Sequence, residues 1–520
     1  MKTITDITLS PEQLFVEKRL YQAVAECLRS SIDEIQHVQV LRRSIDSRRA
    51  PAKYRVTANV YFKGEPIEQL SQPSDYKDVS NATPVIIVGA GPAGLFAALR
   101  ALELGLKPII IEQGKDVSAR RYDIARLTRE KIVNPQSNWC CGEGGAGTFS
   151  DGKLYTRSTK RGNIADVLQK FVEHGASPDI LIDTHAHIGT DRLPEIIANI
   201  RRTIETHGGQ YVFETQIVDF VTNGNGEVLG VADAKGNTYE GAATILATGH
   251  SARGIYELFD KKGWALEPKP FALGVRVEHP QHLINTIQYH TEKYSHFLPP
   301  ATYSLVTQVG GRGVFSFCMC PGGIIVPAAT GDGQQVVNGM SNSRRNSPYA
   351  NSGIAVQVST VDVPEYQKYG VLSLLRFQQD VEKAVFAVAG NAINAPAQRM
   401  TDFCNGRRTR HLAKSSYMGQ CVEAPLHEVL PRFVATALRQ AFRDFGKKMY
   451  GYYTDNAMLL AVESRTSSPV RIPRGEDMQH FELKRLYPCG EGAGYAGGIT
   501  SSAMDGINCM SRIAECLMKS

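Results

Sequence analysis

The stretch Val85–Gly94 constrains this chain more than any other. It begins with the apolar run Val-Ile-Ile-Val, typical of a buried strand, and continues as the glycine pattern G-x-G-x-x-G. Residues 95–104 have the composition of a helix, and Pro108–Ile111 is a second apolar strand. A strand, a glycine loop, a helix and a strand within roughly 30 residues predict a βαβ unit that binds a dinucleotide.

The glycines have distinct tasks in such a loop. Gly89 permits the tight turn, Gly91 leaves the backbone bare for a pyrophosphate, and Gly94 lets the helix pack against the sheet. The helix N-terminus adds free N–H groups and a partial positive charge. The predicted pyrophosphate contacts are Gly89, Ala90, Gly91, Pro92, Ala93 and Gly94.

The acidic residue Glu112 ends the second strand, at the spacing from Gly94 that is typical of this fold. A carboxylate at this place accepts the ribose hydroxyls of an adenosine and repels a 2′-phosphate. The sequence therefore predicts an unphosphorylated ribose beside Glu112 and Gln113, and excludes NADP from this site.

Three further segments favour FAD over NAD. Arg120 and Arg121 stand where FAD enzymes often place an arginine against the ribose or phosphates, although a solvated arginine pair would have the same sequence. Gly142–Lys153 is a glycine-dense loop that can bring N–H groups to the pyrophosphate and the flavin edge, although a merely flexible loop would also read this way. The contacts predicted from this loop are Gly145, Gly147, Thr148, Phe149, Ser150 and Lys153.

The third segment lies near the end of the chain. Gly492–Gly497 also fits G-x-G-x-x-G, but the short stretch that follows it cannot complete a second dinucleotide domain. We expect the N-terminus of a last helix to face the flavin C2 carbonyl, where its dipole favours the anionic reduced ring. The predicted contacts are Gly490, Glu491, Gly498, Ile499 and Thr500.

A strand and a turn in the middle of the chain complete the predicted FAD contacts. Residues 216–220, 228–232 and 237–239 read as a three-stranded meander with glycine-containing turns, and Thr244–Ala247 reads as one more buried strand. We place Ile217 and Val218 of the meander, and Ala247, Thr248 and Gly249 of the A-T-G turn, beside FAD.

Composition limits the class of protein. The chain has 520 residues, is 42% hydrophobic and 21% charged, and has a net charge of +6, which does not favour a nucleic-acid partner. It has neither a long apolar run nor an apolar leader, and its ten cysteines do not suggest a disulfide framework. We expect a cytoplasmic protein without a membrane span. The sequence predicts no oligomeric state.

The N-terminal segment, 1–80, reads as a small α+β module. Ser10–Gln13 is a helix start with a capping box, and residues 36–41 and 55–62 alternate as strands do. Arg42, Arg43, Arg48, Arg49 and Lys53 lie between those strands. They form either a basic patch for RNA or an acidic partner, or a solvated strand face beside Asp46.

Several motifs together resemble a known family, the uncharacterised FAD-dependent dehydrogenases often labelled NAD-utilising dehydrogenases. The resemblance covers nearly the whole length. The stretches that carry it are Gly144–Lys153 (GGAGTFSDGK), His187–Leu193 (HIGTDRL), Ala247–Arg253 (ATGHSAR), Asn351–Gly353 (NSG), Glu463–Arg471 (ESRTSSPVR), Gly490–Gly506 and Arg42–Arg49.

The resemblance implies FAD, a two-part flavoprotein fold and no known substrate. The wider architecture that it implies is similar to that of fumarate-reductase-like and hydroxylase-like flavoproteins, in which a substrate domain is inserted into the FAD domain. We therefore expect an α/β fold: a Rossmann-like FAD-binding domain with an inserted mixed α+β substrate domain and the small N-terminal module. The expected domains are 1–80, 84–265, 266–465 and 466–520.

The candidate catalytic residues are Lys153, His250, Arg253 and Arg465, basic groups inside the glycine-rich and polar motifs. Each has a structural alternative, as a salt bridge or a phosphate contact. The adjacent Cys140 and Cys141, and the Cys318–Cys320 pair, read as buried or loop thiols. His185 and His187 have no second ligand cluster, so no metal is expected.

The leading hypothesis is an FAD-dependent oxidoreductase that transfers hydride through flavin N5 to or from a small organic substrate. The alternatives are a flavin-dependent tRNA-modifying protein and an electron-transfer flavoprotein without its own small substrate. No NAD(P)H domain is evident in the sequence. Two reductants of the flavin therefore stay open: NAD(P)H that binds only transiently, or another protein.

Overall fold

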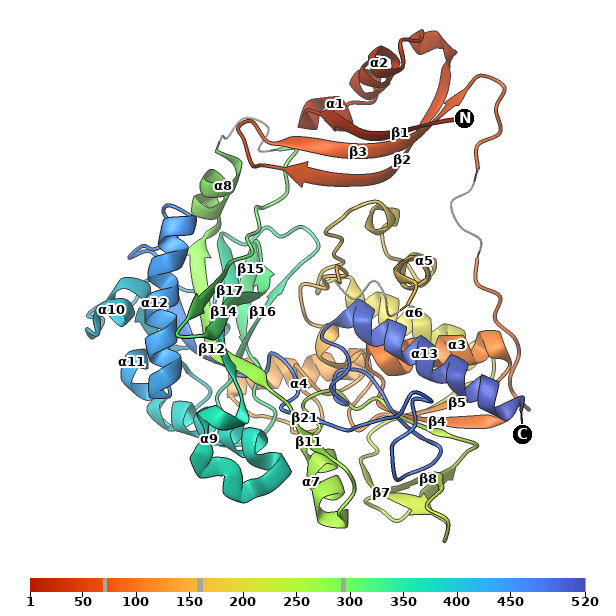
Figure 1. Cartoon of the computed structure of the whole chain (residues 1–520), viewed down its shortest axis with the longest axis vertical. Coiled ribbons are helices and arrows are strands. Elements are labelled where there is room, and N and C mark those ends of the chain that lie inside the picture. The colour runs from red at the N-terminus through yellow and green to blue at the C-terminus, as the bar shows by residue number, and fades with distance from the viewer. Residues whose placement is uncertain (69–72, 157–161, 291–295, 520) are drawn as a thin grey trace.

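The computed structural model describes residues 1–68, 73–156, 162–290 and 296–519. Helices and strands alternate along these residues in the α/β class expected from the sequence (Figure 1). Three bodies are visible: a parallel sheet with helices, a larger and mainly antiparallel sheet, and a small N-terminal module above both (Figure 1).

A parallel sheet, of five strands in the described part of the chain, carries the predicted βαβ unit. Strands β4 and β5 and helix α3 fall where the sequence placed them. In spatial order the strands are β22 (Leu486–Pro488), β10 (Thr244–Leu246), β4 (Pro84–Val88), β5 (Lys107–Ile111) and β6 (Gln210–Val212). The helices of this region are α3 (Pro92–Leu104), α4 (Val117–Glu130), α5 (Ile164–Glu173), α6 (Leu193–Thr206), α7 (Arg253–Lys262) and α13 (Ile499–Leu517).

Both faces of the parallel sheet are buried, which explains the unbroken apolar run of β4. Val85 and Ile87 pack in one core with α3, α6 and α13. Ile86 and Val88 pack in another core with α7 and an antiparallel meander. The meander consists of β7 (Ile217–Thr222), β8 (Val228–Asp233) and β9 (Thr238–Glu240), close to the predicted bounds.

The larger sheet is built from residues 271–463. Its order is β13 (Val306–Val309), β14 (Arg312–Cys320), β17 (Tyr349–Val358), β12 (Phe271–Pro280), β20 (Met458–Glu463), β18 (Ala395–Arg399) and β19 (Cys421–Glu423). Two ribbons accompany it: β15 (Gly323–Pro327) with β16 (Val337–Ser341), and β11 (Glu267–Pro268) with β21 (Val470–Arg471). Its helices are α8 (Gln281–Tyr289), α9 (Ser373–Val388), α10 (Met400–Asn405), α11 (Leu426–Val429) and α12 (Arg432–Lys448). Helix α12 covers one face through Val434, Leu438 and Phe442.

The N-terminal module is an antiparallel sheet with the order β1 (Lys2–Leu9), β3 (Lys53–Phe62) and β2 (Ile35–Asp46), packed under α1 (Pro11–Phe15) and α2 (Glu17–Leu28). The predicted capping box at Ser10 is confirmed, because Ser10 and Gln13 exchange side-chain-to-backbone hydrogen bonds. Strand β1 was not predicted. The predicted single helix is divided at Val16, whose backbone is extended.

Several basic residues of the module are paired with acids. Arg42 and Arg43 lie within β2 rather than between strands. Arg43 forms ion pairs with Asp179 and Asp183, which lie between α5 and α6, at 3.2 and 2.5 Å. Arg48 pairs with Asp46, and Arg55 pairs with Asp6. Acidic residues of the same chain therefore compensate Arg43 and Arg48, two of the five residues of the predicted basic patch.

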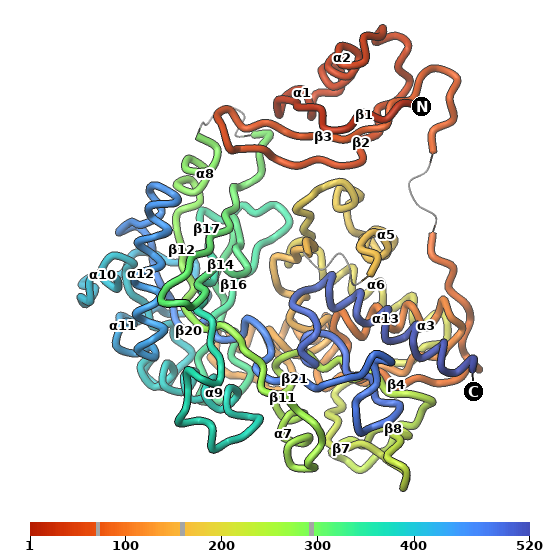
Figure 2. Tube along the Cα trace, viewed as in Figure 1, coloured from red at the N-terminus to blue at the C-terminus, as the bar shows by residue number. Residues whose placement is uncertain are grey.

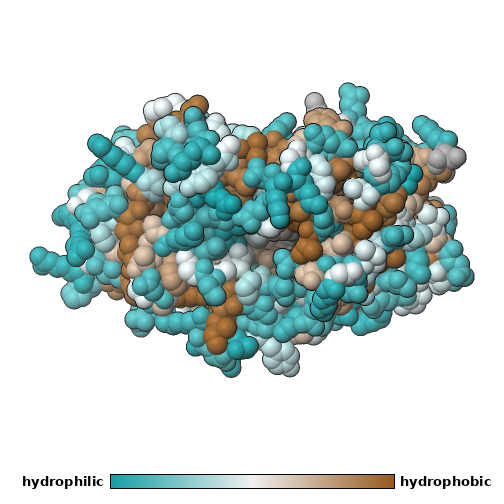
Figure 3. All heavy atoms as spheres, turned by 90° about the horizontal axis from the view of Figure 1, so that it is seen from below, coloured by the Kyte–Doolittle hydropathy of each residue, from teal (hydrophilic) through white to brown (hydrophobic). Residues whose placement is uncertain are grey.

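The C-terminal helix packs beside a helix from the first βαβ unit. Figure 2 shows the C-terminal helix α13 beside α3, although α3 ends at Leu104 and α13 begins only at Ile499. In the described residues, no helix has the length and apolar character needed to cross a membrane. Hydrophilic side chains cover most of the face in Figure 3, and apolar ones form scattered patches.

The close packing of α13 on α3 depends on Gly506. A Cβ atom at Gly506 would lie 2.0 Å from the carbonyl oxygen of Ala93. Gly506→Ala is therefore expected to destabilise the fold by about 1–3 kcal/mol through overpacking, measured as a lower urea midpoint. Glu515→Ala, on an exposed part of the same helix, is the control. Equal midpoints for both variants would contradict this packing.

Candidate functional site

The glycine loop after β4 forms one wall of a cavity. Gly89 has a φ of +106°, and a Cβ there would lie 2.5 Å from the carbonyl oxygen of Ala247, so only glycine fits. A Cβ on Gly94 would lie 2.0 Å from the Gly89 carbonyl oxygen. Gly91 is different, because a Cβ there would meet only Gly145, at 4.0 Å. The space in front of Gly91 belongs to the cavity.

Helices α3 and α13 begin at this cavity. Their N-cap residues are Gly91 and Gly498, and neither helix has a side-chain hydrogen bond to its first N–H groups among the described residues. Uncapped N-termini attract anions and carbonyl oxygens. The two helices thus present two separate sets of donors to one space.

Glu112 lines the cavity at the end of β5. Its two carboxylate oxygens accept hydrogen bonds from the backbone N–H groups of Ala90 and Gly114, each at 2.9 Å. These bonds fix the carboxylate and leave each oxygen a second lone pair for a ligand.

The arginines after β5 do not lie where the sequence led us to expect them. Arg120 is fully buried and outside the cavity lining. Its guanidinium donates to the carbonyl oxygens of Asn138, Trp139 and Glu143 at 2.7–2.9 Å, and burial lowers its pKa to about 10. Arg120 therefore supports the glycine loop from behind. Arg121 is exposed on α4 and also lies outside the lining.

The cavity has a volume of about 490 Å³, within the usual range of ligand sites. It brings together most of the predicted residues: Gly89, Gly91, Pro92, Ala93, Glu112, Gln113, Gly145, Gly147, Ser150, Lys153, Ile217, Val218, Ala247, Thr248, Gly249, His250, Arg465, Gly490, Glu491, Gly498 and Ile499. Six other predicted residues do not line the cavity: Ala90, Gly94, Thr148, Phe149, Arg253 and Thr500. Thr500, for example, donates its hydroxyl to the Leu154 carbonyl oxygen.

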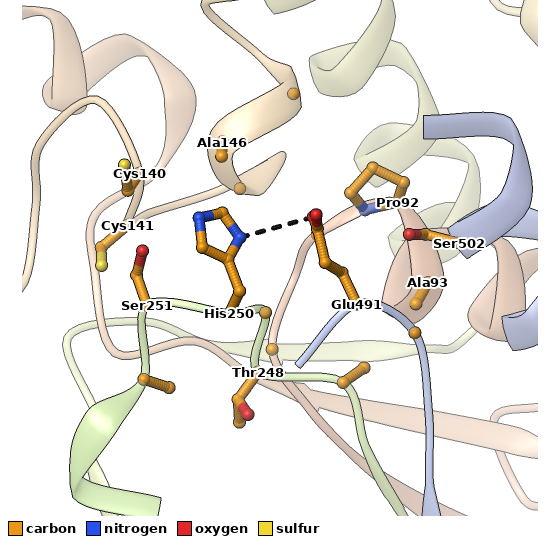
Figure 4. Close-up of a pocket in the computed structure, with 18 of the residues that line it drawn as sticks. Pro92, Ala93, Cys140, Cys141, Ala146, Thr248, His250, Ser251, Glu491 and Ser502 are labelled. Atoms are coloured by element: carbon orange, nitrogen blue, oxygen red, sulfur yellow. Dashed lines mark ion pairs between the residues drawn. The ribbon is translucent and has the colours of Figure 1, made fainter. Parts of the chain in front are cut away.

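His250 and Glu491 face each other across the cavity (Figure 4). The His250 Nδ1 atom lies 3.4 Å from a Glu491 carboxylate oxygen. They come from the turn after β10 and the segment after β22, so two neighbouring parallel strands place them. Such a pair can orient the imidazole and hold a proton.

Arg253 and Arg465 share one buried carboxylate, that of Glu382 on α9. Glu382 lies 2.9 Å from the Arg253 guanidinium and 3.2 Å from that of Arg465. Although burial opposes ionisation, the two arginines hold the pKa of Glu382 down, at about 2. Arg465 reaches the cavity from this network, and Arg253 stays behind it.

Lys153 ends the glycine loop. Its ammonium group donates to the Met319 carbonyl oxygen and lies 3.5 Å from the carboxylate of Asp151, which itself pairs with Arg345 at 2.6 Å. Lys153 thereby connects the FAD-binding side with the larger sheet.

Three matches to known protein families fall on the chain. Residues 84–121 match a family described as an FAD binding domain. Residues 270–466 match a family described as an FAD-dependent protein, C-terminal domain-like. Residues 1–61 match a domain of unknown function. An uncharacterised protein of Clostridium beijerinckii is 38% identical over 519 residues, covering 95% of this chain and 96% of that protein.

The chain belongs to the family of this clostridial protein. It is a flavoprotein oxidoreductase, and its cofactor is FAD. Among solved structures, a flavin-dependent brominase is 13% identical with a TM-score of 0.38, covering 85% of this chain and 80% of that one. A flavocytochrome c3 fumarate reductase is 13% identical with a TM-score of 0.36, covering 84% and 78%. TM-scores this low carry no argument about activity.

The shape and the hydrogen-bond donors of the cavity also fit FAD, independently of the family matches. The missing side chains of Gly91, Gly249 and Gly497 leave open space rather than packed neighbours. The donors suit a pyrophosphate and a polar ring edge, and a fixed carboxylate stands beside them.

The larger sheet and the β15–β16 ribbon contribute lining residues that no motif predicted. Phe317 and Cys318 come from β14 and Asn338 from β16. Cys140 and Cys141 also line the cavity. The adjacent Cys140 and Cys141 and the pattern Cys318-Met319-Cys320 stood out in the sequence, without a sign that they face the cofactor site.

One group of metal-ligand type occurs in the described residues: Cys489, Asp505 and Cys509. The Arg474 guanidinium already binds Asp505 at 2.6 and 3.0 Å and lies 3.6 Å from the Cys509 sulfur. A cation therefore already compensates this acidic group. His187 bonds instead to the Ser343 carbonyl oxygen, at 3.2 Å.

Filling the space in front of Gly91 is expected to prevent FAD binding. Gly91→Val places a branched side chain against the uncapped α3 N-terminus, so the variant should purify with less than about a tenth of the wild-type flavin. Absorbance of the purified protein measures this. The control is Gly224→Val, at an open turn. Full flavin content in Gly91→Val would contradict the placement of the pyrophosphate.

Glu382→Gln leaves two buried arginines without a carboxylate, and is expected to destabilise the protein by about 3–5 kcal/mol. The folded-state pKa of Glu382 lies below its ordinary value of 4.5, at about 2. Its stabilisation is thus complete above about pH 4.5 and is lost as the pH falls toward about 2.

Urea midpoints measured through this acid range test the pH effect. They should fall less steeply in Glu382→Gln than in the wild type. Glu257→Gln, in an exposed pair with Arg376, is the control. Parallel pH profiles for wild type and Glu382→Gln would show that Glu382 is not ionised in the fold.

Proposed function

We propose that the protein is an FAD-dependent dehydrogenase or reductase that acts by hydride transfer on an organic substrate. When bound, FAD supplies the hydride chemistry at its N5 atom. The observation that carries the proposal is the extent of the cavity. It passes from the glycine loops to Phe317 and Cys318 of the larger sheet and to Asn338 of the β15–β16 ribbon, and so offers space beyond the cofactor. An electron-transfer module without its own substrate has no need of that space.

The cofactor contacts follow from the cavity wall. We place the pyrophosphate at the N-terminus of α3 and against Gly145, the adenosine ribose at Glu112 and Gln113, and the flavin at the mouth of α13. Ile217 and Val218 lie beside the adenosine in this arrangement. It treats residues 84–265 and 466–520 as the FAD-binding domain and residues 266–465 as the substrate domain.

The candidate catalytic groups have separate tasks in this proposal. Lys153 attracts an anionic group of the substrate, because its ammonium stands on the wall between the two sheets. His250 takes or gives the proton that accompanies hydride transfer, and Glu491 orients it. Arg465 fixes the polar wall through Glu382, and Arg253 is a positioning residue behind it.

NAD(P)H enters the proposal only as a transient reductant, supported by the family resemblance. The tRNA-modifying alternative is weaker. Its support was the basic cluster of the N-terminal module, and Arg43, Arg48 and Arg55 of that module pair with carboxylates of the same chain.

Anaerobic rapid mixing tests the proposal. Protein reduced with dithionite is mixed with a panel of organic acceptors, and reoxidation is followed by flavin absorbance. We expect an anionic acceptor to reoxidise the flavin, and Lys153→Met to weaken its binding about tenfold or more through loss of a charge-assisted contact. Neutral acceptors should not distinguish the two proteins.

The matched control is Lys447→Met, an exposed lysine on α12. Reoxidation by one-electron carrier proteins alone, with no response to any organic acceptor, would overturn the proposal in favour of an electron-transfer module. Adding NADH and NADPH separately to the oxidised protein identifies the reductant by loss of the oxidised-flavin band.

A further inference from the structure

Strand β14 turns a cysteine toward the FAD cavity by means of a bulge. Phe317 pairs with Gly353 of β17, and Cys320 pairs with Asn351, so three steps on β14 match two on β17. Cys318 lies in this irregularity with a φ of +44°, which is uncommon for a residue with a side chain. The bulge places Cys318 in the cavity lining beside Lys153. Strained backbone of this kind often marks a functional position.

A second cysteine stands two residues further on. A fully extended chain would place their Cα atoms roughly 6.5 Å apart, and this upper limit for the pair already lies within the range of about 4.4–6.8 Å that a disulfide needs. The sulfur of Cys320 lies 3.3 Å from the Cys318 carbonyl oxygen, and the two thiols are hydrogen-bonded to each other. Cys318 and Cys320 can therefore join without a large change of the backbone.

Two cations stand at this pair. The Arg276 guanidinium lies 3.4 Å from the Cys320 sulfur and donates to the Cys318 carbonyl oxygen at 2.6 Å. The Lys153 ammonium donates to the carbonyl oxygen of Met319, between the two cysteines. The hydrogen bond from Cys320 and these two charges hold the pKa of the Cys318 thiol well below its usual range, despite burial.

The fold holds Arg276 at this position firmly. Arg276 is fully buried and donates to Glu463 at 2.7 Å and to Asn351 at 2.8 Å. Gly339 makes room for it, since a Cβ there would lie 2.2 Å from the guanidinium. A buried cation held against the sulfur of Cys320 and the backbone of Cys318 favours a thiolate at this pair.

We propose that Cys318 and Cys320 form a redox-active dithiol that exchanges electron pairs with the flavin. The inference rests on the placement of the flavin in the proposed function. In the oxidising direction, the Cys318 thiolate and the Cys320 thiol lose two electrons and one proton and form one S–S bond. Oxidised FAD accepts the two electrons and the proton as the anionic reduced flavin. In the reverse direction the reduced flavin returns them, the S–S bond breaks, and the electrons remain available for the organic substrate.

The other cysteines of the cavity wall suit this role less well. Cys140 and Cys141 are adjacent, and vicinal cysteines form only a strained disulfide. Burial raises the pKa of the Cys141 thiol to about 12, which keeps it protonated. Cys489 and Cys509 lie with Asp505, and the hydrogen bond with Cys509, together with burial, raises the pKa of the Cys489 thiol well above its usual range.

An anaerobic reductive titration of the FAD-loaded, air-oxidised protein tests the dithiol. The wild type should take up about four electrons per flavin, because disulfide and flavin each accept two. Cys318→Ser and Cys320→Ser should each take up about two. Cys318→Ala is a second variant in case the serine at the bulge disturbs the fold. Cys421→Ser, of a thiol outside the cavity lining, is the control and should behave as the wild type.

Alkylation followed by mass spectrometry gives a readout independent of the flavin. Cys318 and Cys320 should resist alkylation in oxidised protein and accept two labels after reduction, also in protein stripped of FAD. The proposal is overturned if both cysteines are labelled in both states, or if the wild type takes up only about two electrons per flavin. It is also overturned if Cys140→Ser with Cys141→Ser, rather than Cys318→Ser, removes the extra electron pair. Uptake of about four electrons without reoxidation by any organic acceptor would instead count against the proposed function alone.

Discussion

Helices α3 and α13 begin at one cavity, and in the described residues no side chain accepts hydrogen bonds from their first N–H groups. Unsatisfied donors at a helix N-terminus favour an anion or a carbonyl oxygen in front of them. The rest of the architecture follows from bringing these two ends together. Gly506 lets α13 lie close against α3, and strands β10 and β22 extend the sheet so that their loops reach the same space.

Buried charges hold the walls of that cavity. Arg120 organises the glycine loop through backbone carbonyl oxygens, Glu382 fixes Arg253 and Arg465, and Arg276 fixes the bulge in β14. Each makes several hydrogen bonds or ion pairs within the fold. Because these groups are fixed before a ligand arrives, the walls need little reorganisation when the cofactor binds.

Local patterns made the FAD side of the molecule predictable. The strand, loop and helix around Gly91 lie within a short stretch of chain, and the glycines there are dictated by close contacts such as that of Gly94 with the Gly89 carbonyl. The N-terminus of α13 at Gly498 was predictable because its glycine pattern also lies within a short stretch of chain. The capping box at Ser10 is likewise a contact between residues three positions apart.

Long-range pairing made the rest unpredictable. Strand β12 pairs with β20, which lies far along the chain, and no periodicity in either segment specifies that register. Arg120 looked like a phosphate ligand because its neighbours Asn138 and Trp139 come from a loop whose path the sequence does not reveal. The orientation of Cys318 depends on a bulge, which is a property of two strands together.

The central claim is that one FAD spans the two helix mouths in each chain. Release of the ligand from purified protein by denaturation, followed by chromatographic identification and quantification against the protein concentration, tests this most directly. We expect FAD at about one molecule per chain. Protein that carries no flavin and takes none up from added FAD, or that releases FMN or NAD in its place, would contradict it.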